Sequence, residues 1–588
     1  MGKIRDIIFD PGVVKDDSLL AAARSRSRRR WADSDRIRFV GNYPQKVGGW
    51  GRYSANTFTG MCRGALAWMD GSNNIRLGLG THKKLMVMEA DTIQNITPAR
   101  ASGTMGADPF TTTNGSTTVT VVHAGHGFAA GDYVEFDGAA AVGGITPDGN
   151  YEIASVVDVD TYTIAHTSAA SSAATGGGAS VTYVSEISIG RADGAQGTGY
   201  GVGAYGAGTW GTARTVFILF QPRVWSLDQW GVTLLAMPTD GNLYQWSNDI
   251  VTRALLVSGA PTSNTGFFVT EEKHIVVLDA GGTKMKVQWN DQDSSTEWSV
   301  SDQTTAGSRN LQGGTKMLQG IRTSRTNLLL SDAAVWTMTF IGGEDTFGFD
   351  QVAAGAAGGI SPHCAVEVDG TVYWMGKNDF YQYDGTVRRV RNSGDIRRFV
   401  FDNISSLQGF KCHAVYNSLF KEIWWFYATA GEIDRYVKVN LETMAWDVGS
   451  LARTSGVDLG LYGNPLWASS DGYVYEHESG TDDYLSAMNE FIESAPFQID
   501  DGNRVVDINS FLPDFQTITG DVLVSLLTRE YPQASEVEES ISTITSATET
   551  ADMRGSGRQA QIRVTSTTTS AHWRLGVPKL DVSPGGER

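Results

Sequence analysis

The chain has 588 residues, 68 of them glycine, and carries a formal net charge of −18 at pH 7. This length predicts two to four domains, and many glycine and aromatic residues with only 19% charged residues favour short β-strands joined by tight turns. The acidic balance argues against a protein that wraps nucleic acid, which needs a basic face for the phosphates, but leaves open a channel through which DNA slides without adhering.

The three cysteines, Cys62, Cys364 and Cys412, are too widely spaced for a disulfide framework or a zinc site, so we expect buried thiols. Residues 1–10 lack the apolar core of a signal peptide. No run approaches the roughly 18 apolar residues of a membrane span. We therefore expect a protein without a membrane span that is made in a reducing cytoplasm.

Residues 15–31, KDDSLLAAARSRSRRRW, predict a short N-terminal helix. Two aspartates lie at its start and five arginines crowd its end, as the helix dipole favours. These arginines are candidate contacts to DNA or to an adaptor protein; a solvated face or another protein contact is the plainer interpretation. They are Arg24, Arg26, Arg28, Arg29 and Arg30.

From Trp31 to about Pro98 the chain shows short strand patterns separated by turn residues. Residues 107–187 differ, because Thr, Ser, Ala, Gly and Val dominate there and Trp is absent. Apolar and polar residues alternate through this segment, which predicts a small inserted β-domain. Residues 190–214 are rich in glycine but contain interleaved aromatic residues, so we expect an ordered loop.

Between residues 215 and 480 an apolar strand, a turn and an aromatic strand recur without a strict repeat. Examples are WGVTLLAMPTDGNLYQW (230–246) and AVEVDGTVYWMGKNDFYQYDG (365–385). The spacing is near the roughly 40–50 residues of a propeller blade. Alternation returns after Pro496, which predicts a C-terminal β platform module.

The predicted fold class is therefore mainly β. It consists of a β-propeller with a small inserted β-domain, a C-terminal β platform module and a short N-terminal helix. The expected organisation is an N-terminal arm with the first strands (1–106), the insertion (107–187), the propeller body (188–495) and the C-terminal module (496–588).

No motif in the sequence predicts catalysis, a cofactor or a metal site. His123 and His126 lack partners at ligand spacing. GGTKM occurs at 281–285 and 313–317 but has neither the Ser or Thr nor the upstream glycine of a phosphate loop, so we interpret the pair as repeated turns in sister blades. A propeller glycosidase remains a rival, and it would require groups such as Asp350, Glu367 and Arg388 to converge in the central funnel.

Several long phrases give the chain a resemblance to known proteins. They include PGVVKDDSLLAAARSRSRRRWADSDRIRFVGNYPQKVGGW near the start, VWSLDQWGVTLLAMPTDGNLYQW and ISPHCAVEVDGTVYWMGKNDFYQYDG in the middle, and WRLGVPKLDV near the end. Through these phrases the chain resembles the packaged-DNA-stabilisation, or tail hub and nozzle, proteins of short-tailed phages. The phrases span both ends of the chain, with 107–187 as an accessory insertion.

The resemblance implies a non-enzymatic virion protein, assembled in the host cytoplasm, that forms a ring below the portal and its adaptor. The ring is usually hexameric. Implied partners are other copies of the chain, adaptor and portal-side proteins, tail fibre or plug proteins, and genomic DNA that passes without sequence specificity. The alternative is a carbohydrate-binding or glycan-cleaving propeller acting as a receptor-binding tail protein, which predicts a monomer or trimer and a pocket of aromatic and carboxylate groups. A cellular scaffold propeller is weakened by the absence of a regular repeat.

Overall fold

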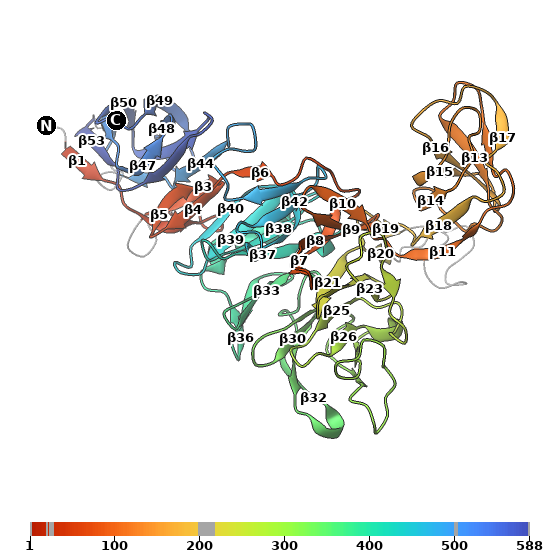
Figure 1. Ribbon diagram of the computed structural model, residues 1–588. Helices are drawn as coiled ribbons and strands as arrows, with labels where there is room; N and C mark the ends of the chain where they lie inside the picture. The colour runs from red at the N-terminus through yellow and green to blue at the C-terminus, as the bar shows by residue number, and fades with distance from the viewer. Residues whose placement is uncertain (1–2, 19–20, 23–28, 198–217, 499–503, 586–588) are drawn as a thin grey trace, which may run out of the picture.

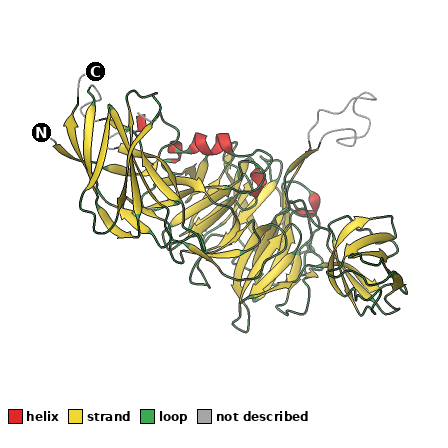
Figure 2. Ribbon diagram, turned by 90° about the horizontal axis from the view of Figure 1, so that it is seen from above, coloured by secondary structure: helices red, strands yellow, loops and turns green. Residues whose placement is uncertain are grey.

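The computed structural model describes residues 3–18, 21–22, 29–197, 218–498 and 504–585. Figure 1 shows three bodies in a row: a β module that contains both chain ends, a central propeller, and a β-domain on the far side of the propeller. The fold is mainly β, as predicted, and Figure 2 shows how few helical turns accompany the strands. In the described part of the chain no helix is long and apolar enough to cross a membrane.

The propeller has seven blades, each a four-stranded antiparallel sheet. Their innermost strands pack side by side in a closed ring. These strands are β7 (Cys62–Met69), β21 (Trp225–Trp230), β25 (Gly266–Val269), β29 (Met317–Ile321), β33 (Ala365–Val368), β37 (His413–Asn417) and β41 (Arg453–Val457). We call the face where they begin the N-face and the face where they end the C-face.

Two further strands continue each blade outward. The second strands are β8 (Ile75–Thr81), β22 (Thr233–Pro238), β26 (Ile275–Leu278), β30 (Asn327–Ser331), β34 (Thr371–Met375), β38 (Glu422–Tyr427) and β42 (Leu466–Ser469). The third strands are β9 (Leu85–Glu89), β23 (Tyr244–Trp246), β27 (Lys286–Trp289), β31 (Ala334–Phe340), β35 (Phe380–Tyr383), β39 (Arg435–Asn440) and β43 (Val474–His477).

The outermost strands close the blades, and in one case the strand comes from the other end of the chain. They are β10 (Thr92–Asn95), β24 (Leu255–Leu256), β28 (Gly307–Asn310), β32 (Phe347–Ala354), β36 (Val387–Arg389), β40 (Trp446–Ser450) and β6 (Trp50–Arg52). Strand β6 pairs with β43, more than 400 residues later, and so completes the seventh blade. The indole N–H of Trp50 donates to Asp483 at 2.7 Å and anchors this closure.

The first blade, β7 to β10, precedes the insertion. The propeller therefore draws on residues 50–95 as well as on the predicted 188–495 range. Local pattern assigned these strands to a separate N-terminal segment because the insertion separates the first blade from the other six, and because β6 pairs only with the distant β43. Short helical segments sit between some strands: η1 (Ala280–Gly282), η2 (Gly343–Asp345), η3 (Ser393–Asp395), α2 (Arg397–Asn403) and η4 (Gly409–Lys411).

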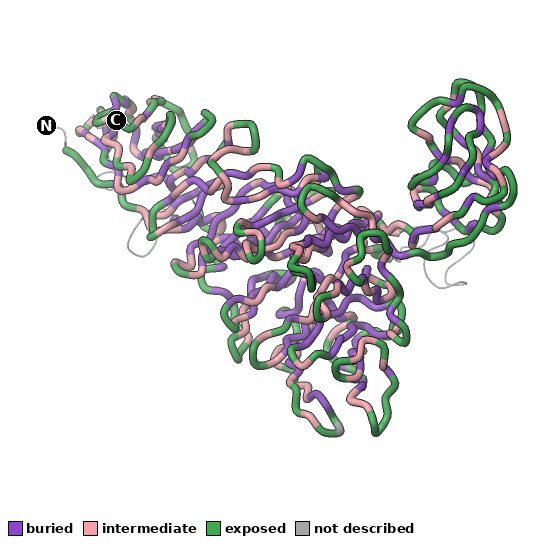
Figure 3. Tube along the Cα trace, viewed as in Figure 1, coloured by how far each residue is buried: buried purple, intermediate pink, exposed green. Residues whose placement is uncertain are grey.

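Large aromatic residues fill the space between blades. Figure 3 shows buried positions running along the strands, with exposed positions at the loops. Among the described residues nine tryptophans are fully buried, two of them in the terminal module. Trp225 packs between the first two blades and donates its indole N–H to Thr81 O at 2.7 Å. The three cysteines are buried and unpaired. Aromatic burial of this kind is what propeller blades need to pack without strict repeats.

The inserted domain is one eight-stranded antiparallel sheet that curls around its own core. Its two ends, Ala99 and Glu186, pair with each other in a two-stranded stalk, so the domain leaves and rejoins the propeller at one place. Its strands are β11 (Ala99–Thr104), β12 (Phe110–Thr112), β13 (Thr118–Val122), β14 (Tyr133–Asp137), β15 (Gly149–Val156), β16 (Thr161–Ala165), β17 (Ala174–Gly176) and β18 (Thr182–Glu186).

The terminal module interleaves strands from both ends of the chain around one apolar core. The N-terminal strands are β1 (Lys3–Asp6), β2 (Phe9–Val13), β3 (Arg29–Asp35), β4 (Ile37–Val40) and β5 (Tyr43–Lys46). The C-terminal strands are β44 (Glu490–Ser494), β45 (Phe497–Gln498), β46 (Val506–Leu512), β47 (Phe515–Thr519), β48 (Val522–Arg529), β49 (Val537–Ile544), β50 (Ala551–Gly557), β51 (Gln559–Ser566), β52 (His572–Leu575) and β53 (Lys579–Pro584).

The helix predicted over 15–31 is wrong at both of its described ends. Asp16 and Asp17 form a bend, and only Ala21 and Ala22 are helical among the residues described in the middle. Residues 29–31 belong to β3, which pairs with β44. Sheet pairing satisfies the backbone of β3 and buries Trp31 in the module core, and this tertiary gain outweighs local helix propensity.

Candidate functional site

The C-terminal ends of four innermost strands surround a cavity of about 560 Å³ on the C-face. It is lined from the end of β21, from β25 and the turn after it, from the turn after β27, from the loop after β29 and from β33. The lining residues are Gln229, Trp230, Gly231, Val269, Thr270, Glu271, Lys273, Asp293, Arg322, Thr323, Ser324 and Glu367. A space of this size matches the lower half of the range for small-molecule sites.

A second cavity of about 330 Å³ continues from the first toward the N-face, and the two share Arg322 and Glu367. Its walls are the middle portions of the same innermost strands, from Ser226 on β21 to Val366 on β33. Together the two cavities follow the propeller axis along the second to fifth blades. We call them the axial cavity.

Most polar side chains of the axial cavity bind backbone groups of neighbouring blades. An innermost strand has a free edge, so its N–H and C=O groups need partners. Asp228 accepts the N–H of Val269 at 2.8 Å, and Arg322 donates to the Val269 carbonyl at 3.3 Å. Gln319 both donates to and accepts from the backbone of Ala365, each at 3.0 Å. These groups hold adjacent blades together.

The chain's own connection between the insertion and the second blade lies on the N-face, against the beginnings of the first and sixth blades. Arg63, on β7, donates to Ala192 O at 3.0 Å, and Lys411 pairs with Asp193. Gln408 and the backbone of Gly194 exchange two hydrogen bonds at 2.9 and 3.0 Å. The connection then enters a short hairpin of β19 (Ala195–Gly197) and β20 (Ile218–Phe220).

The charged groups suggested for a glycosidase do not converge. Glu367 lies on an innermost strand and lines the axial cavity, whereas Asp350 and Arg388 lie on the outermost strands of two different blades. Arg388 pairs with Asp384 on its own blade. The carboxyl group that does lie deep in the cavity is Asp228; burial raises its pKa, and hydrogen bonds from Val269 and Gln229 partly oppose the rise.

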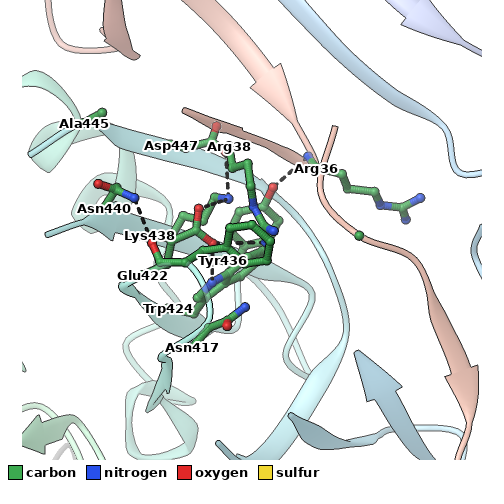
Figure 4. Close-up of polar contacts among 12 residues, drawn as sticks. Arg36, Arg38, Asn417, Glu422, Trp424, Tyr436, Lys438, Asn440, Ala445 and Asp447 are labelled. Carbon is green, nitrogen blue, oxygen red and sulfur yellow. Dashed lines mark hydrogen bonds and ion pairs between the residues drawn. The ribbon is translucent and has the colours of Figure 1, made fainter. Parts of the chain in front are cut away.

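A second concentration of charge joins the terminal module to the propeller (Figure 4). Arg38 on β4 contacts Glu422 and Glu478, and Lys438 on β39 contacts Glu422 at 3.2 Å and Asp447 at 3.6 Å. Burial raises the pKa of Asp447 to about 7, although Lys438 opposes the rise. All five side chains are buried and face one another, so this charge cluster is a joint between two bodies and offers no access to a ligand.

The structure describes only two of the five candidate arginines of the N-terminal segment. Arg24, Arg26 and Arg28 lie outside the described residues, and Arg29 begins β3. Arg30 is largely buried and pairs with Asp395 at 2.6 Å. Beside it, Asp16 accepts the backbone N–H groups of Arg398 and Phe399 at the start of α2. Arg30 therefore helps to fasten the segment to the propeller.

His123 and His126 occupy an aromatic cluster in the insertion. His126 uses both ring nitrogens, one toward Asp158 O at 3.0 Å and one that accepts the Phe128 N–H at 2.9 Å. The ring of His123 packs against Tyr183 at 4.3 Å, and burial lowers its pKa to about 4. Within the described ranges no group of three or more His, Cys, Asp or Glu residues is arranged to hold a metal ion.

The interpretation of the two GGTKM segments as repeated turns in sister blades is wrong, because they do not lie at equivalent positions. The first follows β26 within the third blade, and the second leads into β29 of the fourth. One carboxylate holds both: Asp279 accepts the N–H of Met285 at 2.8 Å and of Met317 at 3.0 Å. The shared letters therefore reflect one turn network between two blades.

Sequence reasoning missed most of the residues that line the axial cavity. They come from four blades and are separated by up to about 140 residues, and no periodic motif marks them. The available signal was weak: several of them lie at the end of a strand or in the turn after it, as Trp230 and Glu271 do.

No family model and no curated protein matches the chain. Among solved structures, it is similar to a phage phi92 endosialidase, with 12% identity over 83% of this chain and 70% of that one and a TM-score of 0.19. It is also similar to the extracellular domain of the putative one component system BT4673 from B. thetaiotaomicron, with 8% identity, coverage of 96% and 78%, and a TM-score of 0.30. A third is YCF48 bound to D1 peptide, with 7% identity, coverage of 65% and 97%, and a TM-score of 0.27. Superpositions this weak say nothing about function, and the propeller assignment rests on the chain's own sheet order.

Proposed function

We propose that the protein is a structural component of a phage tail, a hub or nozzle subunit in a ring below the portal and adaptor. In this role it forms part of the DNA channel, retains the packaged genome and conducts it on ejection. The resemblance of its phrases near both ends and in the middle supports the proposal. The observation that carries it is the engagement of the axial polar groups in blade-to-blade hydrogen bonds, which suits a rigid building block.

Under this proposal the DNA passes between subunits and not along the axis of one propeller. Residues 192–194 lie on the N-face of the propeller through contacts with Arg63, Gln408 and Lys411. The axial cavity, at about 330 Å³ in its inner part, is also far too small for a duplex. A channel would therefore be the central hole of an oligomeric ring, hexameric by resemblance.

The charge distribution supports a lumen that does not retain phosphates. The chain carries −18 overall, and residues 99–187 contain nine acidic residues and one arginine, a net charge of −8. Like charges on the channel wall and the genome prevent adhesion during passage. We place the other partners, adaptor and portal-side proteins and tail fibre or plug proteins, around such a ring in the virion.

The rival is a receptor-binding tail protein that binds or cleaves a glycan. The cavity on the C-face, with Trp230 beside the carboxylates of Glu271 and Glu367, favours binding. Cleavage needs two carboxyl groups on either side of a scissile bond, one of them ready to donate a proton. Asp228 is instead held by two backbone N–H groups of the propeller, a geometry that suits a structural role.

The test is the oligomeric state of the purified full chain, alone and with a portal–adaptor complex. Light scattering and negative-stain imaging should give rings with a central hole, or rings that form when the complex is added. In a salt titration the rings should not bind double-stranded DNA even at low ionic strength, where electrostatic attraction would be strongest, because the lumen is acidic. A stable monomer or trimer that never joins the complex contradicts the proposal.

A further inference from the structure

The polar groups at the mouth of the axial cavity differ from those deeper inside, because several have no role in holding the blades. Glu271 is exposed, and among the described residues its side chain and the side-chain amide of Gln229 have no hydrogen-bond or ion-pair partner. Glu367 accepts the N–H of Gly370 through one oxygen only. Arg322 donates from one nitrogen to the carbonyl of Val269, and the other nitrogens of its guanidinium make no hydrogen bond to a described residue.

An aromatic wall stands beside these groups. Trp230 ends β21 and is half-buried: it packs against the apolar core between the second and third blades and also lines the cavity. The hydroxyl of Thr233 donates to its backbone carbonyl at 2.9 Å and fixes the main chain at this position, while the contacts with the core restrict the indole itself. A rigid aromatic surface next to free acceptors and donors is suited to a ligand with both an apolar face and many hydroxyl groups.

The charge of the mouth selects among ligand classes. Glu271, Glu367 and Asp293 face only Lys273 and Arg322, and Lys273 is already paired with Asp293 at 3.1 Å. The groups left for a ligand are thus two carboxylates and one guanidinium. A phosphate or carboxylate ligand would meet net repulsion, whereas the hydroxyl groups of a neutral sugar can donate to the carboxylates and accept from the guanidinium.

We propose that this mouth, formed by Gln229, Trp230, Glu271, Arg322 and Glu367, is a binding site for a neutral saccharide. One sugar ring lies with its C–H face on Trp230, and its hydroxyl groups bind Glu271, Glu367 and Arg322. The proposal is for binding alone, and the carboxyl group deepest in the cavity, Asp228, is committed to the backbone. The inference goes beyond the tail role and does not rest on it, since the cavity exists within a single subunit.

The experiment measures binding of defined sugars to the full chain by saturation-transfer NMR, with affinities from titration. The probes are lactose, cellobiose, chitobiose and maltotriose, with 3′-sialyllactose and a short DNA duplex as anionic comparisons. We expect at least one neutral probe to bind at millimolar concentration. Preference for sialyllactose or the duplex would overturn the neutral class, and no binding by any neutral probe would overturn the site.

Two variants locate the binding. Glu271→Gln keeps the shape of an exposed side chain and should weaken binding at least fivefold, and Trp230→Ala should abolish it. Glu538→Gln, an exposed residue of β49 in the terminal module, is the matched control and should bind as the unaltered chain does. Because Trp230→Ala also removes core packing, its melting profile must remain cooperative; Glu271→Gln carries the test if it does not. Binding that survives Glu271→Gln unchanged would assign the sugar to another surface.

Discussion

Arg38 and Glu478 form a two-pronged ion pair across the boundary between the terminal module and the seventh blade, with Nη1 of Arg38 2.9 Å from Oε2 of Glu478. The Arg38 side chain has no exposed surface, and it also lies 3.4 Å from the centre of the Phe420 ring. Asn417 and the N–H of Gly48 complete the hydrogen bonds of the Glu478 carboxylate, at 2.9 and 3.2 Å. Arg38 thus connects the terminal module to the sixth blade, through Glu422, and to the seventh blade, through Glu478.

Replacing Arg38 should therefore be strongly destabilising. Arg38→Met keeps much of the apolar stem but leaves Glu478 and part of Glu422 buried without their cation. Breaking a buried pair in this way costs about 3–5 kcal/mol. Urea unfolding monitored by tryptophan fluorescence should show a large drop in midpoint. Arg554→Met is the control, because its pair with Asp552 is exposed and should be worth at most about 1 kcal/mol. Equal losses of stability for the two substitutions would show that the buried ion pair of Arg38 contributes no more than an exposed one.

Asp447 should make stability decline as the pH rises. Its folded pKa of about 7 lies above the unfolded value near 3.8, so the folded state binds the extra proton between these values. The stabilisation is complete below about pH 4 and is lost as the pH approaches 7. Asp447→Asn mimics the protonated form and should gain stability relative to the unaltered chain over this range, by an amount on the order of a few kcal/mol. Melting temperatures at several pH values measure the difference curve. Asp521→Asn, at an exposed carboxyl group, should give a flat curve, and a flat curve for Asp447→Asn would exclude the mechanism.

The propeller itself was predictable, because strands with aromatic residues recur at blade spacing from 215 to 480. The closing strand β6 was not, since its three residues find their register only by pairing with Tyr475–His477 across the whole chain. The helix predicted over 15–31 was wrong at its described ends for a related reason: Trp31 pairs with Ser494 on β44 and Arg30 pairs with Asp395, and no local pattern reveals such distant partners. The cavity could not be predicted either, because Trp230 and Glu367 are far apart in the sequence and come to line the same cavity only in the closed ring of blades.

The first and second blades meet at a glycine that admits no side chain. A Cβ added at Gly80 would lie 2.4 Å from Cγ of Trp225, which is fully buried. Gly80→Ala should therefore force Trp225 from its position and destabilise the protein by about 1–3 kcal/mol. Gly51→Ala on β6 is the matched control, because nothing lies within 4 Å of the added carbon. Thermal melting compares the two, and the prediction fails if Gly51→Ala proves as harmful as Gly80→Ala.

The insertion should be removable without loss of the propeller. Its core, which contains Phe110, Phe136 and Tyr162, draws on no residue outside the insertion. The chain leaves and returns at Pro98 and Ile187, which are already joined by a backbone hydrogen bond of 3.0 Å. Replacing residues 99–186 by a short glycine linker closes a small loop, which adds little entropy cost.

Excision does remove Glu135 and Glu186, which neutralise Arg253 and, through Glu186, Lys84 of the first blade. These two cations then become exposed to water, where an unpaired charge is tolerated. We expect the shortened chain to keep the fluorescence of its buried tryptophans and to melt within a few degrees of the full chain. Residues 97–188 expressed alone should give a separate cooperative transition. Aggregation of the shortened chain, rescued by adding the isolated insertion, would instead make the insertion a part of the propeller core.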